Sequence, residues 1–262
     1  MNDAFFTTSD GEWFTPTDCS RGPWDAAACH AGPPTALMVR ATERLVPDQR
    51  LARVAVDLMR PIPMAPFRVA AEVRRAGRSV TLTEIWLGDA DTVYAVARGM
   101  HLRRAEIEVP TAPVQGPDLA AATQGTFPIR STVHGLPAIV DAIEVRYDPR
   151  ASQGDGGHTI VWMRTKVPLL ADEEPSPFQR ICPLADSGNG ISYNDYLNRV
   201  LFVNPDLHVS LHRDPVGEWF CSDVVSHWHG DGTGMADASL FDVHGPVGRA
   251  VQHLLLMPAS SQ

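Results

Sequence analysis

The chain has 262 residues, and 44% of them are hydrophobic, which is enough for one large domain or two small ones with ordinary apolar cores. A formal net charge of −9 argues against nucleic acid or an anionic membrane as the main partner. The first residues lack the basic and apolar regions of a signal peptide, and no apolar run approaches the ~18 residues of a membrane span. The four cysteines have neither disulfide nor metal-site spacing. We therefore expect a cytoplasmic protein that has no membrane span and binds no metal.

A buried helix and four strands are predicted for the first hundred residues. Gly32-Pro33-Pro34 starts the helix, because proline is tolerated in a first turn, and Pro47 ends it. The front half of this helix is apolar nearly all round, which predicts burial. Four segments that alternate or are rich in β-branched residues then predict an antiparallel meander: Leu51–Arg60, Phe67–Ala76, Ser79–Gly88 and Thr92–Arg103.

The middle of the chain predicts a linker, two strands and a second helix. Residues 105–138 are rich in proline and glycine, which is typical of a linker. Strands are expected at Ala142–Tyr147 and Thr159–Val167, on either side of a glycine-rich turn. Ser176 and Pro177 form the N-cap and first turn of a helix that runs to about Ser187 and is kinked at Pro183.

A second meander completes the chain. Its strands are expected at Leu207–Arg213, Glu218–His227, Gly234–Asp242 and Val247–Met257. The expected division is therefore an N-terminal module over 1–104, a linker over 105–138 and a C-terminal module over 139–262.

The two meanders are copies of one another. A shift of 153 positions carries Arg60 onto Arg213 and places Val56 on Val209, Gly77 on Gly230 and Asp89 on Asp242 without a gap. Such a repeat predicts two modules of one architecture. Because both copies carry the arginine, we expect it to have a shared structural role.

A helix wrapped by an antiparallel meander, present twice, resembles a double hot-dog fold of the α+β class. The chain resembles the acyl-CoA thioesterase II-like double hot-dog proteins over nearly its whole length. In the first half the resemblance rests on HAGPPTALMVRATERLVPDQRL, DLMRPIP, RRAGRSV and VYAVARGMHLR. In the second half it rests on PLADSGNG, NPDLHVSLHRDPVGEW and GRAVQHLL.

The resemblance implies a hydrolase in which an Asp, a hydroxyl residue and a Gln hold a water against a thioester. Asp186 matches the Asp and Gln252 matches the Gln. Asn204 stands at the hydroxyl position, which is a departure from the family, although an amide can still donate and accept hydrogen bonds. We expect partial burial and the C-terminal end of the second helix to raise the pKa of Asp186.

The expected substrate is an acyl-CoA, with CoA present only as part of the substrate and no separate cofactor. His30, Gly32 and Gly188 are the expected substrate-binding residues, and the backbone N–H of either glycine could bind the oxyanion. Arg74, Arg75 and Arg78 at a hairpin tip are candidates for the CoA phosphates. Two hot dogs in one chain imitate a dimer, and we expect further association into a homo-oligomer, a dimer or higher.

Three alternatives remain open from the sequence. Asn204 in place of a hydroxyl is compatible with a non-catalytic protein that binds acyl-CoA or an acyl carrier. Another thioester, such as an aryl-CoA, could be the substrate. The segment from Asn204 to His208 also weakly resembles the Asn-Pro-Leu-His motif of hot-dog enoyl-CoA hydratases.

Overall fold

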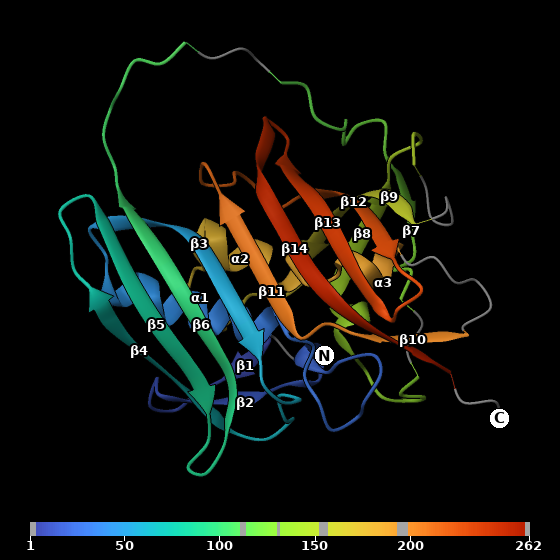
Figure 1. Cartoon of the computed structure of the whole chain (residues 1–262), viewed down its shortest axis with the longest axis horizontal. Helices are drawn as coiled ribbons and strands as arrows, with labels where there is room; N and C mark the ends of the chain where they lie inside the picture. The colour runs from blue at the N-terminus through green and yellow to red at the C-terminus, as the bar shows by residue number, and fades with distance from the viewer. Residues whose placement is uncertain (1–3, 111–113, 130–131, 152–156, 193–198, 260–262) are drawn as a thin grey trace.

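The computed structural model describes residues 4–110, 114–129, 132–151, 157–192 and 199–259, which form one large antiparallel sheet with its helices on one side (Figure 1). The helices of this part are α1 (Gly32–Leu45), α2 (Pro177–Ala185), α3 (Gly188–Ser192), and the short 3-10 helices η1 (Asp18–Ser20) and η2 (Ile139–Ala142). The first half contributes the strands β1 (Phe6–Thr7), β2 (Trp13–Pro16), β3 (Gln49–Leu58), β4 (Phe67–Arg75), β5 (Val80–Gly88) and β6 (Val93–Arg103). The second half contributes β7 (Thr123–Gly125), β8 (Ile143–Tyr147), β9 (His158–Thr165), β10 (Val200–Val203), β11 (Asp206–Leu211), β12 (Phe220–Trp228), β13 (Thr233–Asp242) and β14 (Gly245–Pro258).

The two halves of the sheet are joined edge to edge by equivalent strands. The strand order is β1-β2-β4-β5-β6-β3-β11-β14-β13-β12-β9-β8-β7, so β3 of the first meander pairs with β11 of the second. In the register of this pair Ala55 lies opposite His208, Val54 opposite Val209 and Val56 opposite Leu207. Ala55 therefore pairs with its own equivalent in the repeat, which makes the junction a pseudo-twofold axis.

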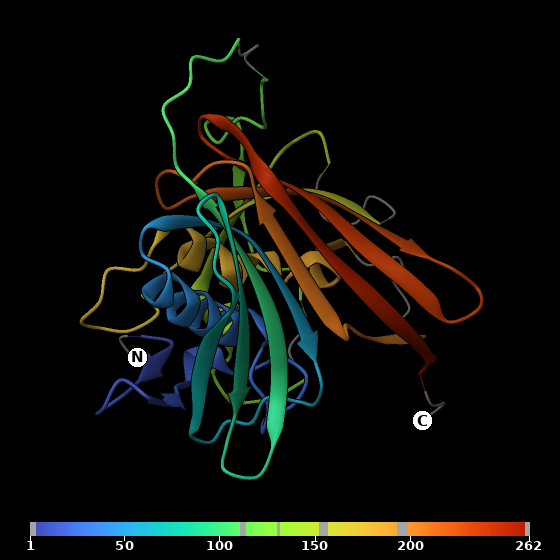
Figure 2. The ribbon, with the colours of Figure 1, turned by 60° about the vertical axis from the view of Figure 1, so that its left-hand side comes forward.

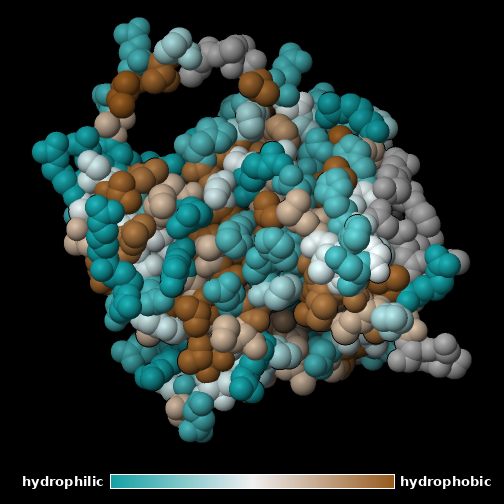
Figure 3. Space-filling model, viewed as in Figure 1, coloured by the Kyte–Doolittle hydropathy of each residue, from teal (hydrophilic) through white to brown (hydrophobic). Residues whose placement is uncertain are grey.

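All the helices lie on one face of the strongly twisted sheet (Figure 2). Helix α1 packs against β3 to β6, and α3 packs against β12 to β14. The core is continuous across the junction, because buried Leu37, Val56 and Ile85 belong to one cluster with Ile181 and Val209. Hydrophilic and hydrophobic side chains are interspersed on the uncovered face, as for an antiparallel sheet with one solvated side (Figure 3).

The sequence predictions are confirmed for both meanders, for α1 and for the second helix, which is α2 with Pro183 inside it. Helix α3, which begins at Gly188, was not predicted. Strand β10 was not predicted, and the residues before it, 193–198, lie outside the described part. The linker residues Thr123–Gly125 form β7, which pairs with β8. The glycine-rich turn was expected at 152–157, of which only Gly157 is described.

Helices α1 and α2 approach each other closely at Gly32. A Cβ at this position would lie 2.8 Å from Pro183 Cα and 2.9 Å from the carbonyl oxygens of Cys182 and Pro183. These are backbone atoms of α2 and cannot turn aside as a flexible side chain can. Glycine at the first position of α1 therefore sets the distance between the two helices.

Gly32→Ala is expected to lower the free energy of unfolding by about 1–3 kcal/mol, the usual range for overpacking. The higher helix propensity of alanine opposes this by at most about 1 kcal/mol, so the clash decides the sign. Denaturant titration measures the change. Gly230→Ala is the matched control, since no heavy atom lies within 4 Å of its added Cβ. Equal midpoints for the two variants would contradict the proposed close approach.

The two arginines of the repeat have different surroundings. Arg213 Nη1 and Nη2 donate to Asp242 Oδ2 and Oδ1, each at 2.6 Å, and Nη2 also donates to the Gly245 carbonyl at 3.0 Å. The repeat equivalent of Asp242 is Asp89, whose carboxylate accepts hydrogen bonds from the Tyr94 hydroxyl and from backbone N–H groups. Arg60 is exposed and forms no ion pair with a described residue. Only Arg213 therefore has the structural role expected of both.

Two further findings concern the chain as a whole. Within the described part of the chain, no disulfide joins Cys19, Cys29, Cys182 or Cys221, as the sequence predicts. Among the described residues, no helix combines the length and the apolar character that a membrane span requires.

Candidate active site

A cavity of about 410 Å³ opens where the two halves meet. Its walls come from the segment before α1, the end of β3, α3, β10 and β14. Most of them are apolar, with Leu58, Ile62, Ile129 and Leu254 among the contributors. Trp24 and Phe202 meet edge to face at the wall, with ring centroids 5.6 Å apart. This volume lies in the range of ligand pockets in proteins.

Asp186 is the buried carboxylate of this cavity. It is the C-cap residue of α2, and its side chain is 4% exposed. Oδ1 accepts hydrogen bonds from Asn204 Nδ2 at 2.9 Å and from Gln252 Nε2 at 2.8 Å. The three residues that the resemblance assigns to catalysis are thus in direct contact.

Gln252 lies on β14 and is fully buried between the carboxylate and α3. Its Nε2 also donates to the Asp186 carbonyl at 2.9 Å, and its Oε1 accepts the backbone N–H of Asn189 at 3.2 Å. A Cβ on Gly188 would lie 2.7 Å from Gln252 Oε1, so a larger residue there would displace the amide from this position. In this arrangement Gln252 positions Asp186.

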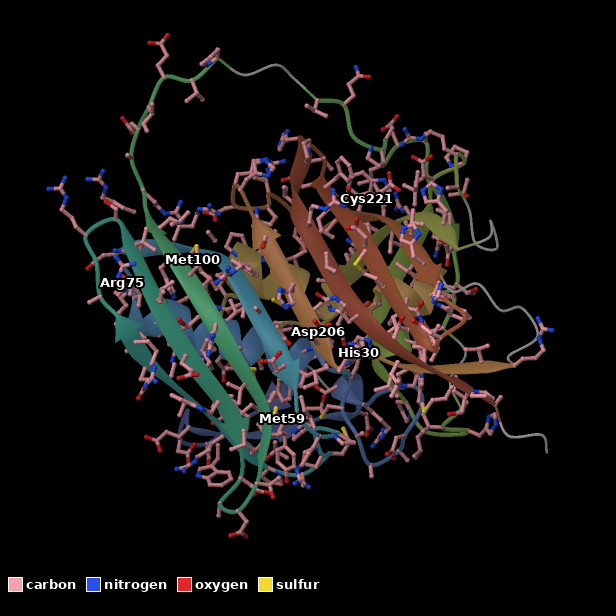
Figure 4. The ribbon with its side chains drawn as sticks, viewed as in Figure 1. His30, Met59, Arg75, Met100, Asp206 and Cys221 are labelled. Carbon is pink, nitrogen blue, oxygen red and sulfur yellow. The ribbon has the colours of Figure 1, made fainter. Side chains whose placement is uncertain are left out.

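The first half of the chain also contributes to the site. His30 Nδ1 lies 3.0 Å from Asp186 Oδ2 and 3.3 Å from the backbone N–H of Gly32. Figure 4 shows His30 near the ends of β3 and β11, at the junction. Neither Gly32 nor Gly188 lines the cavity, whereas His30 does.

Burial raises the pKa of Asp186 above its ordinary value of 3.8. The nearby His30, the amides of Asn204 and Gln252, and the Gly32 N–H act in the opposite direction without cancelling the rise. Burial, which was expected, is the largest cause. The backbone N–H of Gly32, at the start of α1, lowers the pKa, and the contribution expected from the C-terminal end of α2 stays a prediction.

This shift predicts the pH dependence of a reaction that uses Asp186 as a base. The carboxylate must be ionised to accept a proton, so kcat/KM should rise with pH through the raised pKa and then level off. The acid limb should lie above pH 3.8, with a tenfold loss per pH unit below it. A kcat/KM profile measures the limb, and an acid limb that persists in Asp186→Asn would assign it to another group.

Asn204 keeps one polar atom available to a ligand. Its Nδ2 donates to Asp186, and more weakly to the Asp206 carbonyl at 3.4 Å. Its Oδ1 accepts no hydrogen bond from a described residue, and Asn204 lines the cavity. The residue at the hydroxyl position of the family pattern thus holds the carboxylate and offers an acceptor.

Asn189 is a buried polar residue of the cavity that sequence reasoning missed. It follows Gly188 in the short helix α3, is 2% exposed and lines the cavity wall. Its Nδ2 is buried and has no hydrogen-bond partner among the described residues. The sequence signal for this residue was the string Gly188-Asn189-Gly190, because local structure alone does not account for an asparagine between two glycines in a buried segment.

Two sequence candidates lie away from the cavity. Arg74, Arg75 and Arg78 are at the β4–β5 hairpin, which Figure 4 shows far from His30, and none of them lines the cavity. Arg60 is the arginine on the wall. His208, the histidine of the hydratase-like string, is exposed on β11 and does not line the cavity.

No group of three or more His, Cys, Asp or Glu side chains among the described residues is arranged to hold a metal ion.

Two antiparallel meanders, joined edge to edge in one sheet that wraps their helices, with a buried carboxylate at the junction, define a double hot-dog protein. Residues 20–106 match the acyl-CoA thioesterase N-terminal domain, and residues 110–256 match the acyl-CoA thioesterase C-terminal domain. The chain therefore belongs to the acyl-CoA thioesterase family and is a thioester hydrolase.

Solved structures confirm the double hot-dog fold. A putative thioesterase from Novosphingobium aromaticivorans has a TM-score of 0.75 at 16% identity, with 96% of this chain and 98% of that chain covered. A putative thioesterase II from Thermobifida fusca gives 0.73 at 12% identity, with 99% and 98% covered. An acyl-CoA thioesterase II from Mycobacterium marinum gives 0.68 at 17% identity, with 97% and 96% covered. A search of curated proteins finds no match to the chain.

Proposed function

We propose that the protein hydrolyses a fatty or related acyl-CoA with a water activated by Asp186. The observation that carries this proposal is a buried carboxylate, held by Asn204 and Gln252, on the wall of an apolar cavity. A carboxylate in that setting can take a proton from water, and the apolar walls suit an acyl chain. No cofactor other than the CoA of the substrate is part of the proposal.

The proposed reaction begins with a water that donates hydrogen bonds to the Asp186 carboxylate and to Asn204 Oδ1. The water oxygen attacks the thioester carbon as its proton passes to Asp186, which gives a tetrahedral oxyanion. The carbon–sulfur bond then breaks as the carbonyl re-forms. The CoA thiolate leaves and takes up the proton held by Asp186, so the products are the acid and free CoA. Gln252 and His30 keep the carboxylate in place.

Arg60 is the candidate contact for the CoA phosphates. It is exposed on the cavity wall, where its charge is available to an anionic group. The equivalent Arg213 is held by Asp242 and is not available in this way.

The proposal is tested by release of free thiol from a panel of acyl-CoAs that differ in chain length, together with aryl-CoAs. Turnover of at least one of them at an enzyme-like rate is expected. Binding of acyl-CoA without thiol release would instead favour the non-catalytic alternative. Turnover of aryl-CoAs alone would change the substrate class and keep the reaction.

The homo-oligomer is also a proposal. Leu201 and Val203 of β10 lie opposite Met257 and Leu255 of β14, so these four side chains share one face of the two-stranded extension. All four are exposed, by 36–52%. An exposed apolar group of this kind is compatible with a contact between copies, which sedimentation equilibrium would measure.

A further inference from the structure

One half of the Asn189 side-chain amide is paired and the other half is not. Oδ1 accepts from Trp228 Nε1 at 3.0 Å and from Ser226 Oγ at 2.9 Å. Nδ2 is buried and has no partner among the described residues. Leaving a buried donor unpaired costs free energy, so such a group needs an explanation from strain, water or a ligand.

The orientation of this amide is determined by Trp228. An indole N–H can donate but cannot accept, so the amide atom facing it must be the oxygen. The backbone N–H of Asn189 is fixed as well, because it donates to Gln252 Oε1 at 3.2 Å. The backbone and Oδ1 are therefore both held, and Nδ2 is the remaining donor of a residue that lines the cavity.

The polar side-chain atoms of the cavity then divide by role. Asn204 Nδ2 and Gln252 Nε2 already donate to Asp186, and Arg60 is the candidate contact for the CoA phosphates. Asp186 and Asn204 Oδ1 can accept hydrogen bonds from a water. Neither Asp186 nor Asn204 Oδ1 can stabilise the negative charge that forms on the carbonyl oxygen, because both are acceptors. The glycines expected to do so, Gly32 and Gly188, do not line the cavity, and the Gly32 N–H is directed at the His30–Asp186 pair.

We infer that Asn189 Nδ2 hydrogen-bonds the carbonyl oxygen of the bound thioester and the oxyanion that forms from it. The inference rests on the proposed function, because it assigns the donor that hydrolysis at Asp186 requires. An aligned, preorganised amide of this kind acts on the charge that develops in the transition state. Trp228 is then a positioning residue, which acts by orienting Asn189.

Asn189→Asp is the direct test, because it keeps an oxygen toward Trp228 and replaces Nδ2 with an acceptor. We expect kcat to fall by about 10²–10³-fold, the usual result of removing one oxyanion donor. Trp228→Phe removes the indole N–H, so kcat should also fall, by less. Thr159→Val is the matched control: it removes the buried hydrogen bond from Thr159 Oγ1 to the Ile191 carbonyl beside α3 and should keep the wild-type kcat.

Two unreactive analogues separate carbonyl binding from a structural role. In one, CH2 replaces the thioester sulfur and leaves a ketone; in the other, CH2 replaces the carbonyl and leaves a thioether. Wild type and Thr159→Val should bind the ketone more tightly than the thioether. Asn189→Asp should lose this preference and keep the wild-type affinity for the thioether.

The outcomes distinguish the inference from the proposed function. If wild type releases no thiol but shows an Asn189-dependent preference for the ketone, hydrolysis fails as the function and the inference stands. If hydrolysis is found and Asn189→Asp retains the wild-type kcat and ketone preference, the inference is overturned and the function stands. A wild type that binds both analogues equally, or neither of them, also overturns the inference.

Discussion

Replacing Asp186 with asparagine is expected to lower kcat/KM for the best acyl-CoA by about 10²–10⁴-fold, the contribution of a general base. The change is nearly isosteric. The asparagine oxygen can still accept from Asn204 and Gln252, and its NH2 can face His30 Nδ1, which lies 3.0 Å from Asp186 Oδ2. A rate within a few-fold of wild type in a thiol-release assay would remove Asp186 from the mechanism.

The stability of the same variant serves as its control. The pKa of Asp186 is raised on folding, so between the unfolded and folded values the native state binds more protons. Its contribution to stability is therefore fully present below the unfolded pKa and is lost as pH rises through the folded one. Asp186→Asn should be at least as stable as wild type at pH 7, and its advantage should disappear in acid. A loss of activity accompanied by a large loss of stability at pH 7 would indicate misfolding instead.

Arg213→Ala is expected to lower the free energy of unfolding by about 3–5 kcal/mol, the loss typical of breaking a buried ion pair from one side. The Asp242 side chain is fully buried, whereas that of Arg213 is 30% exposed. Burial raises the pKa of Asp242, but hydrogen bonds from Arg213 and from two backbone N–H groups outweigh it, so the pKa lies below the ordinary value. Without Arg213, a buried charge remains with only those two backbone donors.

Arg60→Ala is the control that the repeat itself supplies. Arg60 is exposed, so its removal should change the free energy of unfolding by no more than about 0.5 kcal/mol. Urea titration at several pH values compares the two variants. Because the folded pKa of Asp242 is depressed, the stabilisation by its pair with Arg213 is present above the unfolded pKa and lost as pH falls through the folded one. The difference between the variants should therefore shrink in acid, and equal midpoints at pH 7 would contradict the assignment.

The meanders could be predicted because alternation and turn residues are local signals. The sequence repeat also showed that β3 and β11 are equivalent strands. The register in which they pair could not be predicted, because it depends on contacts between residues distant in the sequence. Strand β10 has only four residues and shows no clear alternation, so its pairing with β14 decides its structure. The end of α2 was predicted, but α3 was missed because Asp186 and Ser187 resemble a simple helix end with no helix after it.

The candidate site was predictable only in part, and for a different reason. Asp186, Asn204 and Gln252 were identified by resemblance, and the structure brings their side chains together. Which atoms they use depends on packing: Gln252 contacts α3 because Gly188 leaves room for it. The free Nδ2 of Asn189 depends on Trp228, which is 39 residues away in the sequence. Charge alone also could not show that the β4–β5 hairpin lies far from the cavity.

The junction between the halves has a consequence for how the protein can be divided. His30 and Gly32 come from the first half, and Asp186 with the amides that hold it comes from the second. Two polypeptides cut within residues 105–138 would each hold an incomplete set of these groups. Hydrolysis would then require the two fragments to associate. When association is weak, the initial rate should be proportional to the product of the two fragment concentrations, whereas the initial rate of the intact chain is proportional to its own concentration.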